Sequence, residues 1–236
     1  MLGPFLFLRL KIISTSGIFE PTASDMKRRI LTFLFTFYFL ASHAQFAFEL
    51  KTGDLLFQDL DCGPLCEAIE SVTEGIDGRD FSHCGIVMVE DGQKFVIEAI
   101  GPGVIKTDLK QFLRRSGDSL VVKNVVAARL NSDFQNLIIP AITEAKLLLG
   151  KAYDHVFDLK NDAYYCSELL YDIFRKANNG REVFDLAPMT FKKPNTDDYD
   201  AAWVNYYQDL GAEIPEKALG TNPGLISRSD KIFILK

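Results

Sequence analysis

The sequence has few side chains that could bind metals or support nucleophilic chemistry, since its 236 residues include three histidines and four cysteines. Internal repeats, low-complexity segments and Pro/Gly/Ser-rich linkers are also absent, which argues against a repeat architecture and against several domains. The chain has no excess of basic residues, because its formal charge is −6. Nucleic acids and anionic membrane surfaces are therefore not expected as partners, whereas small or cationic substrates are compatible with this composition.

The sequence offers no apolar run that predicts a permanent membrane span. Residues Ile30–Leu40 form an apolar run of about eleven residues, whereas a spanning helix needs roughly 20. The basic stretch Met26–Arg29 precedes this run, and the small-x-small triplet Ser42–Ala44 follows it. This order is typical of a cleaved secretory signal peptide over residues 26–44, and a permanent anchor is the less favoured alternative.

A signal peptide at this position divides the chain. Residues 1–25 would be an upstream extension that results from a start codon assigned too early, without a role in export or folding. Residues 45–236 would form the mature protein, a length that suits one domain with a substantial core. The residue directly after the cleavage site near Ala44 is Gln45 and not a cysteine, so a lipoprotein is not predicted. We expect a periplasmic or secreted protein.

The mature part intermixes strand-like and helix-like patterns, which predicts an α+β fold. Two histidines, His83 and His155, remain in it. Strands are predicted at residues 53–58, 82–89, 94–100, 104–107, 120–129 and 231–235. Helices are predicted at residues 66–73, 109–115, 134–149 and 201–210, together with one that starts at Cys166 and stops at Asn178–Gly180.

The dipeptide Asp91–Gly92 between two β-prone runs predicts a tight hairpin. With these two residues as the turn, Gly85 faces Glu98, and His83 lies diagonally from Glu98 on the same face of the sheet. Such diagonal partners are about 7 to 8 Å apart at the backbone. Because an unpaired buried carboxylate is costly, a histidine partner explains a glutamate in this apolar strand. The pair is either a catalytic base with its orienting carboxylate, or two residues that satisfy each other or face water.

Cys166 opens an amphipathic helix, which gives this thiol two possible roles. In the first turn of a helix, unpaired backbone N–H groups and the positive end of the helix dipole favour a thiolate, so Cys166 is a candidate nucleophile. The alternative is a buried, inert cysteine, because free cysteines are among the most buried residues. The apolar positions at helical spacing are Leu169, Leu170, Ile173 and Phe174.

His155 is a rival to His83 as the base, because it lies eleven residues before Cys166. It has no carboxylate that a hairpin would hold against it. The other cysteines, Cys62, Cys66 and Cys84, could be read with His83 as a zinc site. Strand alternation should place Cys84 and His83 on opposite faces, which argues against zinc.

Cys62 and Cys66 leave a separate question open. A disulfide between them is chemically allowed in an exported protein. The spacing does not fix the Cα separation that a disulfide needs. The alternative is that both are core cysteines at the start of a helix.

Five short motifs follow one another in an order that resembles the YiiX-like cysteine hydrolases, which belong to the circularly permuted branch of the NlpC/P60 papain-like superfamily. In ordinary papain-like enzymes the nucleophile precedes the histidine, whereas here the histidine strand comes before the cysteine helix. The resemblance covers roughly Thr52–Lys176 and implies a permuted papain-like fold with an antiparallel sheet packed against helices. The motifs are Gly53–Phe57, Phe81–Val87, Val96–Ala99, Tyr153–Asp154 with Phe157, and Tyr164–Leu169.

Carried over by position, the resemblance implies that Cys166 is the nucleophile, His83 the general base and Glu98 the residue that orients the base. It implies hydrolysis of an amide or related acyl bond through a thioester intermediate. The N–H of Cys166 at the helix start is the expected oxyanion donor. Asp54 and Tyr165 are predicted to line the substrate site. Neither a metal nor an organic cofactor is expected.

The resemblance leaves the substrate open between a small peptide, including cell-wall fragments, and an N-acylated amino acid. One alternative is a lipid-directed acyltransferase or esterase of the same fold. The other is a non-catalytic module that binds cell-wall fragments or a partner protein.

Overall fold

The computed structural model describes residues 48–116 and 124–235. The predicted upstream extension at 1–25 and the predicted signal peptide at 26–44 lie outside the described residues. No helix within the described ranges is long and apolar enough to cross a membrane.

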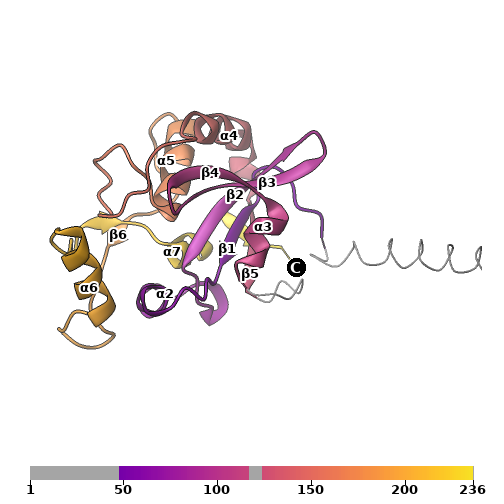
Figure 1. The fold of residues 1–236 in the computed structure, drawn as a ribbon. Coiled ribbons are helices and arrows are strands. Elements are labelled where there is room, and N and C mark those ends of the chain that lie inside the picture. Colours follow the sequence, from indigo (N-terminus) through magenta and orange to yellow (C-terminus); the bar gives the residue numbers. More distant parts are fainter. Residues whose placement is uncertain (1–47, 117–123, 236) are drawn as a thin grey trace, which may run out of the picture. The chain divides into compact units, whose positions relative to one another are not determined.

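Six antiparallel strands form the central sheet, in the order β4-β3-β2-β1-β5-β8 (Figure 1). The last strand of the chain pairs with β5, so the prediction that it joins the sheet is confirmed. The strand predicted from residue 120 is described from Val125. The strands are β1 Leu55–Gln58, β2 His83–Glu90, β3 Gln93–Ile100, β4 Gly103–Asp108, β5 Val125–Leu130 and β8 Ile232–Ile234.

The β2–β3 hairpin has the register that the turn residues predict. Val87 pairs with Val96, as expected from a two-residue turn at Asp91 and Gly92. Both turn residues have positive φ, 50° and 76° respectively, which is the conformation that such a turn requires. Because the register is fixed, the face on which each side chain of β2 and β3 lies is also fixed.

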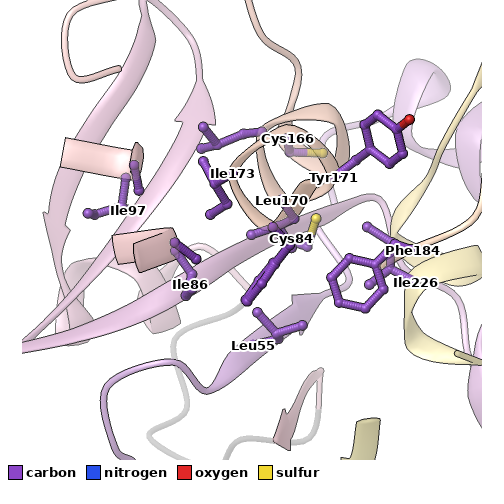
Figure 2. Packing of buried hydrophobic residues seen from close by; sticks show 14 of the residues in the cluster. Leu55, Cys84, Ile86, Ile97, Cys166, Leu170, Tyr171, Ile173, Phe184 and Ile226 are labelled. Atoms are coloured by element: carbon purple, nitrogen blue, oxygen red, sulfur yellow. The ribbon is translucent and has the colours of Figure 1, made fainter. Parts of the chain in front are cut away.

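Two helices cover one face of the sheet, α4 Ile138–Leu147 and α5 Cys166–Ala177. Leu170 and Ile173 of α5 are fully buried against the sheet, and Figure 2 shows them beside Ile86 and Ile97. The opposite face packs against α3 Leu109–Arg114. The helical periodicity of α5 is therefore explained by burial of one face of the helix.

The single helix predicted over residues 134–149 is divided in the structure. A 3₁₀ segment, η2 Ser132–Leu137, precedes α4. Pro140 lies in the first turn of α4, where its missing N–H costs nothing, whereas a continuous helix from 134 would need that N–H as a donor. The proline therefore fixes the point at which the α-helix begins.

A disulfide between Cys62 and Cys66 closes the segment at the start of α2 Pro64–Glu70, with a Cα–Cα distance of 5.4 Å. The disulfide alternative is thereby confirmed. The helix predicted over 66–73 begins earlier, because Pro64 at its first position is preorganised for a helix. It packs against α6 Ala201–Leu210 in an aromatic cluster with Trp203 and Tyr207. The remaining elements are η1 Ile76–Gly78, β6 Ala187–Pro188, β7 Leu219–Gly220 and α7 Pro223–Ser227.

Candidate active site

Cys166 is the first residue of α5, and Tyr165 is the N-cap residue in an extended conformation. The thiol is therefore held where the unpaired N–H groups and the positive dipole end of a twelve-residue helix are concentrated. The Cys166 residue is 6% exposed, so solvent screens these interactions weakly. This placement confirms the predicted start of the helix at Cys166.

His83 is the first residue of β2 and contacts both Cys166 and Glu98. Its Nε2 lies 2.6 Å from Oε2 of Glu98. Burial alone would lower the pKa of His83, but the hydrogen bonds with Cys166 and Glu98 outweigh it and raise the pKa to about 9. The structure thus brings together the three residues that sequence reasoning singled out.

Glu98 lies fully buried on β3 between His83 and a residue that the sequence analysis missed, Arg115. Arg115 follows α3, and its guanidinium group contacts both carboxylate oxygens of Glu98, with 2.9 Å between Nη1 and Oε2. Burial would raise the pKa of Glu98, but the hydrogen bonds with His83 and Arg115 lower it to about 2. A buried carboxylate of this kind is ionised and has two cationic partners.

Gly85 leaves the space that this carboxylate arrangement needs. A Cβ atom at position 85 would lie 2.5 Å from Val96 and 3.2 Å from the Cβ of Glu98. Any larger residue would therefore displace one of these side chains. The glycine in the motif Phe81–Val87 thus has a steric role beside the pair His83 and Glu98.

Cys84 is a second residue that the sequence analysis missed as a neighbour of Cys166. It packs with Leu55 and Ile86 in the core under α5, as strand alternation predicts (Figure 2). His83 and Cys84 are the first two residues of β2. The thiol of Cys166 nevertheless interacts with both of them. Burial raises the pKa of the Cys84 thiol well above its usual value, so Cys84 is a neutral donor.

These contacts lower the pKa of Cys166 well below its ordinary value. The hydrogen bond from Cys84 has the largest effect, and the hydrogen bond and charge of His83 act in the same direction against the desolvation of the buried thiol. Cys166 and His83 are therefore arranged as a thiolate–imidazolium pair. Within residues 48–116 and 124–235, no group of three or more His, Cys, Asp or Glu side chains is arranged to hold a metal ion.

A cavity that is partly open to solvent adjoins Cys166. None of the described residues that line it is Asp, Glu, Lys, Arg or His. Tyr165 lines this cavity, and its hydroxyl accepts a hydrogen bond from the N–H of Thr221 at 3.1 Å. The apolar wall comes from four parts of the chain and includes Ile69, Val72, Phe157, Phe191 and Trp203.

Asp54 and His155 have interaction partners outside the group formed by Cys166, His83 and Glu98. Asp54 is buried in an ion pair with Arg129, with 2.7 Å between Oδ1 and Nε, and it is not one of the residues that line the cavity. His155 is exposed, and its Nδ1 lies 3.3 Å from the hydroxyl of Tyr206. The predicted substrate contacts of Asp54 and Tyr165 stay predictions.

Comparisons with known proteins identify the family and the fold. A family model described as permuted papain-like amidase enzyme, YaeF/YiiX, C92 family, matches residues 49–231. The uncharacterized protein YiiX of Escherichia coli strain K12 is 32% identical over 152 residues, which are 64% of this chain and 69% of that protein. A crystal structure described as metalloprotein YiiX from Escherichia coli O157:H7 aligns with a TM-score of 0.61 and 24% identity, over 80% of this chain and 98% of that chain. At this identity the structural match shows the fold.

Proposed function

The chain belongs to the permuted papain-like amidases of the YaeF/YiiX family, and we propose that it is a cysteine amidase whose catalytic residues are Cys166, His83 and Glu98. The observation that carries this proposal is the convergence of the three side chains: Nε2 of His83 lies 2.6 Å from Oε2 of Glu98, and interactions with Cys166 and Glu98 raise the pKa of His83 against the effect of burial. Cys166 adjoins a partly open cavity, and the described residues that line this cavity include no Asp, Glu, Lys, Arg or His. Nucleophile, base and orienting carboxylate are the three parts that such a reaction requires.

The reaction follows from this arrangement. The thiolate of Cys166 attacks the carbonyl carbon of the amide, and the N–H of Cys166 at the start of α5 stabilises the oxyanion. His83 donates its proton to the leaving amine, so that the C–N bond breaks and a thioester remains. His83 then takes a proton from water, which attacks the thioester and releases the acid and Cys166. Glu98 stays ionised and holds the ring throughout.

The cavity favours an N-acylated amino acid over a cell-wall peptide as the substrate. Its wall lacks charged side chains and is rich in aromatic and aliphatic residues such as Phe157, Phe191 and Ile69. An apolar acyl group gains free energy on burial there. The charged groups along a cell-wall peptide would lose hydration at this wall without a partner. An N-acylated amino acid needs to bury only its acyl group and can keep its carboxylate at the open side of the cavity.

Transfer of the acyl group to an acceptor other than water is a second candidate function. The same cavity supports it, because an acyl chain retained in an apolar pocket gives a second nucleophile time to react.

We also propose that the protein is periplasmic or secreted. The disulfide between Cys62 and Cys66 supports this location, since such bonds persist in oxidising compartments.

The test is a screen of the purified protein against N-decanoylglycine, a cell-wall stem peptide and a phospholipid, with and without a second amine as acceptor. We expect release of decanoic acid by the wild-type protein and complete loss of that activity in Cys166→Ala. Release of an acylated acceptor instead would identify the transferase. Activity that survives in Cys166→Ala would overturn the mechanism, and binding without turnover of any of these compounds would identify a binding module.

A further inference from the structure

Two free cysteines meet where β2 and α5 begin. Cys84 and Cys166 are free thiols, whereas Cys62 and Cys66 are bonded to each other. Cys84 is the second residue of β2 and Cys166 the first residue of α5, and their side chains interact. Because a hydrogen bond acts only at short range, the two sulfur atoms are neighbours. Figure 2 shows the sulfur of Cys84 directed from the strand toward the helix that carries Cys166.

The two thiols differ in access and in reactivity. Cys166 is 6% exposed and lines the partly open cavity, whereas Cys84 is fully buried among apolar residues such as Leu55 and Ile86. The interaction with Cys84 is the main cause that lowers the pKa of Cys166 well below its ordinary value, and burial raises the pKa of Cys84. Oxidants attack the thiolate form. A small oxidant that enters the cavity therefore reacts at Cys166 and not at Cys84.

We propose that Cys166 and Cys84 form a reversible oxidation site, in which hydrogen peroxide oxidises Cys166 and Cys84 then closes a disulfide with it. In the first step the thiolate of Cys166 takes one oxygen atom from peroxide and becomes a sulfenic acid, and hydroxide leaves. In the second step the sulfur of Cys84 attacks the sulfenic sulfur and the S–O bond breaks. The hydroxyl group leaves with the proton of Cys84 as water. The two sulfur atoms together lose two electrons, which the peroxide takes up.

The position of Cys84 decides whether oxidation of Cys166 can be reversed. A sulfenic acid without a neighbouring thiol is oxidised further to a sulfinic acid, which is irreversible in most proteins. The chain has four cysteines, and two of them are already paired as Cys62 and Cys66. Cys84 is therefore the thiol that can trap Cys166. A disulfide joins Cα atoms about 4.4–6.8 Å apart, and α5 packs directly against β2.

This inference goes beyond the proposed amidase function. The disulfide would occupy the sulfur that the proposed mechanism uses, so the oxidised protein should be inactive and a reductant should restore its activity. The bond itself is detected without any substrate. Failure of the amidase proposal and failure of this inference are therefore distinguishable.

The test treats the purified protein with hydrogen peroxide and maps its peptides by mass. Remaining thiols are alkylated at mildly acidic pH while the protein unfolds, because thiolates would otherwise exchange with the disulfide between Cys62 and Cys66. We expect a linked pair of peptides that contain Cys84 and Cys166, which dithiothreitol separates. A free thiol at Cys166 after this treatment, or a sulfinic acid there while Cys84 remains a thiol, would overturn the inference.

Cys84→Ala is the matched variant, because it removes the trapping thiol and keeps a small apolar side chain. Under the same treatment it should accumulate about tenfold more sulfinic acid at Cys166 than the wild type, and dithiothreitol should not reverse this product. The control variant replaces Cys62 and Cys66 by serine, and it should still form the bond between Cys84 and Cys166. Equal amounts of sulfinic acid in the wild type and in Cys84→Ala would contradict the role of Cys84. If Cys84→Ala does not fold, the peptide map of the wild type decides the question.

Discussion

At the scale of single residues, the thiol of Cys166 depends on neighbours that differ in how visible they are in the sequence. His83 and Glu98 could be paired in advance because the turn Asp91–Gly92 fixes the hairpin register. Arg115 could not, because it approaches Glu98 from outside the hairpin, after α3. The sequence held one indication that a second donor such as Arg115 was needed. A buried carboxylate can accept more hydrogen bonds than a single histidine donates, so a second donor is expected.

Arg115 is a positioning residue, since it contacts Glu98 and acts on His83 through it. Replacing it in Arg115→Met should lower kcat/KM about tenfold and destabilise the fold by about 1–3 kcal/mol, because Glu98 loses one buried charge partner. The pKa of Glu98 should rise from about 2, so the stability supplied by this carboxylate should be lost at a higher pH on acidification. Urea unfolding between pH 3 and 7 measures the pH at which this stability is lost. In Arg115→Lys, which keeps a cation at this position, that pH should lie between the values for the wild type and for Arg115→Met. An unchanged acid limb would contradict the assigned role.

The charge state of His83 predicts the alkaline limb of activity. Its pKa is raised to about 9, so the imidazolium that protonates the leaving amine is present below this value and is lost as the pH rises through it. We expect kcat/KM to fall above about pH 9. Glu98→Gln removes the hydrogen-bonding anion that raises this pKa and should move the limb to lower pH. If kcat/KM falls at the same pH in the wild type and in Glu98→Gln, the alkaline limb reports a group other than His83.

At the scale of elements, the strands and the nucleophile helix were predictable and the cavity wall was not. Helix α5 has a clear apolar period, and its first residue, Cys166, is as predicted. The wall also uses short irregular segments around Phe191 and Thr221, which have no periodicity to read. Their positions follow from tertiary packing against α2 and α6, which a local pattern does not encode.

The disulfide between Cys62 and Cys66 anchors α2, which contributes Ile69 to the cavity wall. Replacing both cysteines by serine should lower the free energy of unfolding by about 2 kcal/mol, the chain-entropy value for a loop of this length. Urea unfolding with and without a reductant checks this. The reduced wild-type protein should match the double variant, and a midpoint that is insensitive to reductant in the wild type would contradict the prediction.

At the scale of the whole molecule, the site is assembled from distant parts of the chain. The proposed base and its carboxylate come from the β2–β3 hairpin, the proposed nucleophile comes from α5, and the far cavity wall comes from α6 and the segment around Thr221. The positions of Cys166, His83 and Glu98 could be predicted because these residues belong to regular elements. The resemblance stopped near Lys176, so it gave no information on the segment that completes the cavity.

The predicted export signal has a measurable product. If residues 26–44 are a signal peptide, expression of the complete chain in a Gram-negative host should yield a periplasmic protein whose first residue is Gln45. Intact mass and N-terminal peptide mapping measure this directly. An unprocessed protein that stays in the cytoplasm would contradict the prediction and leave the catalytic proposal unaffected.

The proposed mechanism requires Cys166 to be the nucleophile that carries the acyl group. Rapid acid quench of the protein with an activated acyl amide, followed by peptide mass mapping, tests it most directly. We expect a mass increase equal to one acyl group on the peptide that contains Cys166, removable by hydroxylamine, and no increase on the peptide that contains Cys84. Hydrolysis without acylation of Cys166, or acylation of another residue, would contradict it.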